Sequence, residues 1–277
     1  MLGILPLFTA LLLAPQQVTE RVSLNNAGLE GSGASEAPAV TADGQIIAFQ
    51  SAASDLVAGD TNAKRDILLR DLTAGQTELI SVTSAGLQVD GDSMTPAISA
   101  DGNLVAFASI GSGFAANDIN ATWDVVLRDR AAGTTRILSQ AGGFVGNAYS
   151  WTPAISADGR FVAFESGASN LVHDLNEQPD VFVVELASGA IERVSLSSAG
   201  TEGDAPSLSL RLSSPQLCAL RAIVRAAGGA EGGGGSATPA ATAAAAGSGS
   251  RARNKAQEHA HVAKEEAVVA PAQCCLL

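Results

Sequence analysis

Three polar loops carry the side chains of this sequence that could do chemistry. Each loop has an Asp-x-Asn pattern, followed four residues later by another Asp. The three copies are Asp60, Asn62 and Asp66; Asp118, Asn120 and Asp124; and Asp174, Asn176 and Asp180. Carboxylate and amide oxygens at alternate loop positions, with a carboxylate downstream, are the ligands that a hard cation such as Ca²⁺ requires. The loops are therefore candidate calcium sites, whose shells backbone carbonyls and water would complete.

The same side chains also have a purely structural interpretation. Asp and Asn hydrogen-bond to the backbone two residues on and tolerate the left-handed region, so they form Asx-turns. The fifth loop position, which is Asp or Asn in an EF-hand-like loop, holds Lys64, Thr122 or Gln178. Lys64 and Arg65 also make the first loop the poorest cation site. The sequence leaves calcium and turn formation open, and it suggests no other cofactor.

Enzyme motifs are scarce. The sequence has no Gly-x-Ser-x-Gly nucleophile elbow, and His173 is the one histidine among the repeated segments. An enzyme interpretation would use Asp60, Asp118 and Asp174 as catalytic carboxylates of a hydrolase or lyase. A residue that recurs in every copy is more simply explained by recurring structure, so we predict a non-catalytic protein and keep the enzyme as the alternative.

These loops belong to an internal repeat. Three segments share the pattern Pro-Ala-[Ile/Val]-[Ser/Thr]-Ala-Asp-Gly, followed by a run of apolar residues that ends in Phe; they are residues 37–49, 95–107 and 152–164. Their Asp-Gly pairs begin at Asp43, Asp101 and Asp158, so the period is 58 and then 57 residues. A fixed period of this size indicates a repeat architecture.

Each copy predicts four short strands. In the first copy they are residues 38–42, 45–50, 66–71 and 78–82, with Asp43-Gly44 as a tight turn. The second strand is apolar without alternation, which is typical of a strand covered on both faces. Four meandering antiparallel strands describe a β-propeller blade, and stacking the blades would cover both faces. We therefore predict an all-β chain with blades at about 38–82, 96–139 and 153–196.

The repeat resembles a known family. The segment from Pro153 to Phe164 is similar to the WD40-like repeat of TolB-type periplasmic propellers, and residues 170–183 resemble the version common in secreted bacterial propellers. The resemblance covers about residues 18–209. It implies a periplasmic or extracellular, non-catalytic scaffold that binds a protein or cell-envelope partner through its loops.

The parts outside the three copies predict further organisation. Residues 2–13 are an apolar run too short to span a bilayer, so residues 1–17 are predicted as a signal peptide, with a buried strand as the alternative. Residues 18–24 read as a lone fourth strand, and a fourth unit opens at 191–209, so we expect an open or truncated propeller. Its uncovered ends would favour self-association, and a truncated fragment without independent function is a further alternative. Residues 210–277 lose the repeat and are predicted as a low-complexity, disordered tail, either a divergent extension or a shifted reading frame.

Charge and aromatic content restrict the partners. The net charge of −12 argues against nucleic acid binding, and no run is long enough for an integral membrane helix. Trp123 and Trp151 occupy positions that the repeat does not require. Each is either partly buried against a neighbouring loop or exposed as an interaction residue.

Overall fold

The computed structural model describes residues 19–174, 176–203 and 205–207. The predicted signal peptide and the predicted tail lie outside these residues. All described residues belong to a unit that comprises Met1–Leu212.

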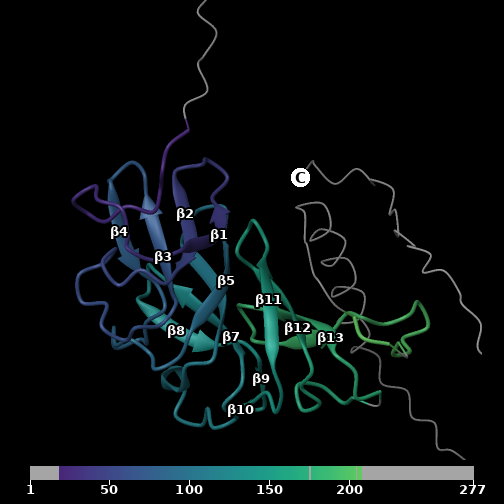
Figure 1. The fold of residues 1–277 in the computed structure, drawn as a ribbon. Coiled ribbons are helices and arrows are strands. Elements are labelled where there is room, and N and C mark those ends of the chain that lie inside the picture. Colours follow the sequence, from purple (N-terminus) through teal and green to yellow (C-terminus); the bar gives the residue numbers. More distant parts are fainter. Residues whose placement is uncertain (1–18, 175, 204, 208–277) are drawn as a thin grey trace, which may run out of the picture. The chain divides into compact units, whose positions relative to one another are not determined.

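Three four-stranded antiparallel sheets form the described chain, and each is one sequence repeat (Figure 1). The first blade contains β1 (Ser35–Val40), β2 (Ile46–Ser51), β3 (Asp66–Asp71) and β4 (Gln76–Leu79). The second contains β5 (Ser93–Ile98), β6 (Leu104–Ser109), β7 (Asp124–Asp129) and β8 (Thr134–Ile137). The third contains β11 (Ser150–Ile155), β12 (Phe161–Ser166), β13 (Asp180–Glu185) and β14 (Ile191–Arg193). The meander order within each sheet confirms the predicted all-β fold with propeller blades.

Two small elements interrupt the connections. A 3₁₀ turn, η1 (Ser112–Phe114), lies between β6 and β7. A two-stranded hairpin, β9 (Gln140–Ala141) with β10 (Phe144–Val145), lies between the second and third blades. The sequence pattern predicted neither of them.

The fourth strands end earlier than predicted. We expected them at 78–82, 136–139 and 192–196, but β4, β8 and β14 end at Leu79, Ile137 and Arg193. The reason is visible after β4, where the Ser81 hydroxyl accepts the backbone N–H of Ile67 at 3.0 Å. A side chain therefore takes the Ile67 N–H, while the Ile67 carbonyl still accepts the N–H of Ile80 at 2.8 Å. The lone strand predicted at 18–24 also differs, since residues 19–23 form no strand and Leu24 makes an isolated bridge with Glu30.

The unbroken apolar second strands are explained by packing between blades. In β6, Phe107 packs with Ala48 and Leu69 of the first blade. Its neighbour Ala106 faces the other way and packs with Phe164 of the third blade. All five side chains are fully buried. A strand between two blades must be apolar on both faces, as the sequence predicted.

Backbone hydrogen bonds join successive blades at equivalent positions. The N–H of Ser93 donates to the carbonyl of Arg65, and the N–H of Ser150 donates to that of Trp123, both at 2.7 Å. The N–H of Ser207 donates to the carbonyl of Pro179 at 2.8 Å, so the beginning of the fourth unit is held in the same way. Nowhere in the part of the chain that the structure describes is there a helix with the length and apolar character needed to cross a membrane.

Candidate functional site

The long connections of the blades share one edge of the sheets. Because the strands alternate in direction, the β2–β3 type of loop and the connection to the next blade lie at the same edge. We call this edge the long-loop face. It comprises the described residues of 19–34, 52–65, 80–92, 110–123, 138–149, 167–179 and 194–207, and it holds all three Asp-x-Asn loops.

The asparagines of these loops form Asx-turns. The side-chain oxygens of Asn62, Asn120 and Asn176 accept the backbone N–H two residues on, at 2.9, 3.0 and 2.9 Å. The residue between has a positive φ of 52–55° in each copy: Ala63, Ala121 and Glu177. The asparagine oxygens thus accept hydrogen bonds from the backbone, as the turn interpretation predicts.

The asparagine amides tie each loop to the connection that follows the same blade. Their Nδ2 groups donate to the carbonyls of Val89, Gly146 and Gly203, at 3.3, 2.7 and 2.7 Å. Asn120 also donates to Asp124 at 3.1 Å. The asparagines therefore connect neighbouring loops of the long-loop face through hydrogen bonds, and these bonds fix the backbone conformation of the loops.

The second aspartates of the pattern are buried at the starts of β3, β7 and β13. Asp66, Asp124 and Asp180 are at most 2% exposed. Their Oδ1 atoms accept hydrogen bonds from Ser81, Ser139 and Ser195, at 2.5, 2.7 and 2.7 Å. Burial raises the pKa of Asp66 and of Asp124 to about 6, although the serine hydroxyls partly oppose the shift.

The first aspartates have different surroundings in each blade. Asp60 accepts a hydrogen bond from the Gln88 amide at 3.1 Å. Asp118 is half-buried, and burial raises its pKa. Asp174 lies 3.4 Å from the guanidinium of Arg193. The nine predicted ligands thus lie in three separate loops, and among residues 19–174, 176–203 and 205–207 no group of three or more His, Cys, Asp or Glu is arranged to hold a metal.

Arg193 makes the third copy different. Its side chain is 4% exposed and lies among three carboxylates, those of Asp174, Asp180 and Glu202, with the Asp180 contact at 3.1 Å. It also donates to the carbonyl of His173 at 3.0 Å. The paired strand positions of the other blades hold Leu79 and Ile137. Sequence analysis missed Arg193, although a charge at an otherwise apolar repeat position is a usable signal.

The Asx-turn geometry predicts the effect of removing one asparagine. We expect Asn120→Ala to lower the free energy of unfolding by about 1–3 kcal/mol, because the Gly146 carbonyl and the Thr122 N–H lose their partners. Urea unfolding with and without millimolar CaCl₂ measures the effect, and we expect the same loss in both. Asn117→Ala is the control, because this exposed amide makes a single bond, to Gly143. A loss that occurs only with calcium present would instead support the calcium interpretation of Asp118, Asn120 and Asp124.

A second feature of the long-loop face is an aromatic cluster between the second and third blades. Trp123 and Trp151 contact each other edge to face, with ring centroids 4.3 Å apart. Tyr149 precedes β11, and its ring lies against Gly167, where an added Cβ would come within 3.2 Å of it. Both tryptophans and the one tyrosine of the 277 residues therefore fall between positions 123 and 151.

Two exposed apolar side chains lie on the loops that directly precede Trp123 and Trp151. Ile119 is 90% exposed and Phe144 is 72% exposed. The loops that carry them are joined by the Asn117 and Asn120 amides, which donate to Gly143 and Gly146. We call Ile119, Trp123, Phe144, Tyr149 and Trp151 the aromatic cluster. Trp123 and Trp151 are half-buried and contact each other, and their role as interaction residues stays a prediction.

The sequence contained a signal for Phe144 that the repeat analysis did not use. Leu29, Leu87 and Phe144 follow equivalent positive-φ glycines and are spaced 58 and 57 residues apart, which is the period of the repeat. All three are more than 60% exposed. A large apolar residue that recurs in an exposed turn, outside the strands, indicates exposed hydrophobic surface, which is typical of interaction sites.

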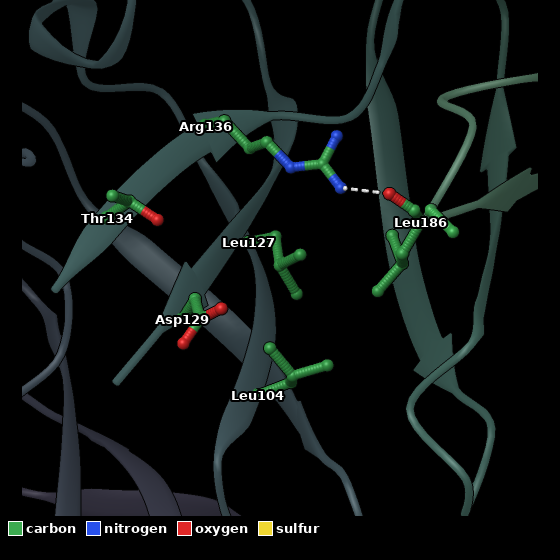
Figure 2. Close-up of a pocket in the computed structure, with 7 residues that line it drawn as sticks. Leu104, Leu127, Asp129, Thr134, Arg136 and Leu186 are labelled. Atoms are coloured by element: carbon green, nitrogen blue, oxygen red, sulfur yellow. Dashed lines mark hydrogen bonds between the residues drawn. The ribbon is translucent and has the colours of Figure 1, made fainter. Parts of the chain in front are cut away.

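The opposite side of the junction holds a pocket of about 250 Å³ (Figure 2). Leu104 and Leu127 line it together with Asp129, Thr134 and Arg136, and Leu186 and Ala187 of the third blade close it. The Arg136 guanidinium donates to the Leu186 carbonyl at 3.1 Å, and burial lowers its pKa. Arg136 therefore links the second and third blades.

Comparison with solved structures returns propellers. TolB from Acinetobacter baumannii is 19% identical, with a TM-score of 0.39 over 62% of this chain and 35% of that one. A prolyl endopeptidase matches with 12% identity and a TM-score of 0.38, over 63% of this chain and 24% of that one. An oligogalacturonate lyase in complex with manganese matches with 15% identity and a TM-score of 0.35, over 58% of this chain and 36% of that one.

The chain thus spans about a third of the length of the TolB structure. No family model matches the sequence, and no curated protein matches it. The structural neighbours include TolB, peptidases and a lyase, so the likeness concerns the fold and not one activity. At the level of the fold, the described chain is similar to the TolB-type β-propellers that its repeat resembles.

Proposed function

We propose that this chain is a non-catalytic binding module that takes a protein or cell-envelope partner on the aromatic cluster of its long-loop face. The observation that carries the proposal is the concentration of both tryptophans, the tyrosine and two exposed apolar side chains on two joined loops and on the start of β11, which follows one of them. Trp and Tyr dominate the energetics of protein interfaces because they bury large areas and retain a polar group.

The rest of the face supports this role. The hydrogen bonds of Asn62, Asn120 and Asn176 hold the loops in one conformation. The loops therefore lose little conformational entropy when a partner binds. The carboxylates considered for catalysis recur in every blade and make contacts inside the protein, with the Gln88 amide of the next connection for Asp60 and with the Asn176 backbone for Asp174. The apolar run near the N-terminus and the resemblance to secreted propellers support a location in the periplasm or outside the cell.

Substitution of the two most exposed members of the cluster tests the proposal. We expect Ile119→Ser with Phe144→Ser to weaken partner binding at least tenfold, which corresponds to about 1.4 kcal/mol, because the buried apolar contact area is lost. The full chain would capture partners from a cell-envelope extract, and calorimetry with the purified partner would then measure the affinity. Since both side chains are exposed, circular dichroism should stay unchanged.

Leu29→Ser is the matched control. Leu29 has the same turn position and is 63% exposed, but it precedes the first blade. We expect it to leave the affinity unchanged within threefold. Equal binding by the wild type and the double variant would refute the role of the cluster.

A further inference from the structure

The loops that frame the aromatic cluster have a one-sided charge. Residues 80–92, 110–123, 138–149 and 167–179 contain no Lys and no Arg. They contain five carboxylates, which are Asp90, Asp92, Asp118, Asp174 and Glu177. The loop of the first blade, residues 52–65, differs because Lys64 and Arg65 balance its two aspartates. The loops around the aromatic cluster thus carry carboxylates that no Lys or Arg of the same loops balances.

Some of these carboxylates are already engaged inside the protein. Asp90 accepts the N–H and the hydroxyl of Ser112 at 2.8 and 2.9 Å, and Arg193 lies beside Asp174. Asp118 directly precedes Ile119, the most exposed apolar residue of the cluster, and no cation lies in its loop. The Ser112 bonds to Asp90 leave its negative charge in place, because the serine is neutral, but Lys64 of the first-blade loop is close enough to compensate part of that charge. Within these four loops the one side chain that can become positive is His173.

We infer that the partner binds through a basic polypeptide segment that carries aliphatic or aromatic side chains. This inference rests on the proposed function and adds the chemistry of the partner. Apolar side chains would cover Ile119 and Phe144, while Lys or Arg would meet the carboxylates around them. Complementary charges speed association and select the partner, and their effect weakens as salt screens them.

The geometry of the tryptophans favours a polypeptide over a carbohydrate. A sugar ring stacks on an open aromatic face, and the edge-to-face contact of Trp123 with Trp151, at an interplanar angle of 89°, covers one face of one of these two rings. The most exposed members of the cluster are Ile119 and Phe144. The aliphatic side chain of Ile119 and the phenyl ring of Phe144 are both surfaces for apolar side chains.

A random 12-residue peptide library tests the inference directly on the protein. Peptides are selected on the full wild-type chain and depleted on the Ile119→Ser, Phe144→Ser variant, and the survivors are synthesised. We expect them to carry net positive charge and at least one large apolar residue. Their affinity should fall at least tenfold on the depletion variant and about tenfold as NaCl rises from 50 to 300 mM.

Charge variants separate this inference from the proposed function. We expect Asp118→Asn with Glu177→Gln to weaken binding of the selected peptides about fivefold and to reduce the salt dependence. Asp43→Asn with Asp101→Asn removes the same charge from the opposite edge, so it should change the affinity less than twofold. Survivors that depend on Phe144 but are neutral or acidic would overturn the inference and leave the proposed function standing. Both the inference and the proposed function would be overturned if no selected peptide depended on the cluster. The same holds if cluster-dependent binding were found on a glycan array and with no peptide.

Discussion

Replacing Arg193 by methionine should lower the free energy of unfolding by about 3–5 kcal/mol, the cost of leaving buried charges without their partner. Arg193 is surrounded by Asp174, Asp180 and Glu202, and its side chain is 4% exposed. Methionine keeps most of the volume but removes the positive charge, so three carboxylates are left close together in a site with little water. Urea unfolding followed by circular dichroism measures the loss.

The first blade supplies the matched control for this change. There Leu79 stands at the strand position of Arg193, and Gln88 stands at the bridge position of Glu202. A variant with Arg193→Leu and Glu202→Gln should therefore recover a large part of the stability that the single variant loses. If Arg193→Met costs less than about 1 kcal/mol, the contacts among these four side chains do not hold the third blade together.

Acidification from pH 7 to pH 4.5 should increase the contribution of two buried carboxylates to stability. Burial raises the pKa of Asp66 and Asp124 from 3.8 to about 6. The folded state therefore holds these protons more tightly than the unfolded state. Their contribution is complete below pH 3.8, decreases as the pH rises to about 6, and is constant above that. Each group contributes up to about 3 kcal/mol across this window.

Asp66→Asn isolates one of these contributions. The second oxygen of Asp66 is buried without a hydrogen-bond partner, so a neutral amide fits this site at least as well as a carboxylate. We expect the variant to be more stable than the wild type at pH 7 by about 1–3 kcal/mol and to show roughly half of the pH-dependent gain. Urea midpoints at pH 7, 6, 5 and 4.5 give the comparison.

Asp101→Asn is the control for pH. The Ser99 hydroxyl lowers the pKa of Asp101 below 3.8, so its titration falls outside the measured window, and this variant should parallel the wild type. If the wild type and Asp66→Asn have the same pH profile, Asp66 is not the group whose proton binding changes on unfolding.

The repeat was predictable from the sequence because short, local sequence patterns specify its turns and strands. Asp43-Gly44 and its two copies predict turns, and contiguous apolar residues such as those of 46–49 predict strands covered on both faces. The turn signal depends on the backbone conformation of two residues, and the strand signal depends on the burial of a few consecutive residues. Strand ends were less predictable, since Ser81 ends β4 through a contact with Ile67, which lies 14 residues away.

The Asp-x-Asn loops could be located but not interpreted from the sequence. Asn and Asp supply the same oxygens to a cation and to a backbone N–H, so residue type and spacing fit both. The structure shows Asn62, Asn120 and Asn176 directed to backbone partners. Calcium binding by the three loops stays a prediction, which the Asn120→Ala experiment addresses.

By itself, then, the sequence determined an all-β chain of stacked four-stranded blades, because period, turn residues and apolar runs act over short distances. The tertiary structure alone decided which side chains meet. It joined Trp123 to Trp151 and the loop of Ile119 to that of Phe144, and it placed Arg193 among three carboxylates that lie on both sides of it in the sequence. Contacts of this kind depend on how loops from neighbouring strands and blades pack, and a repeat pattern contains no information about the positions at which its copies differ.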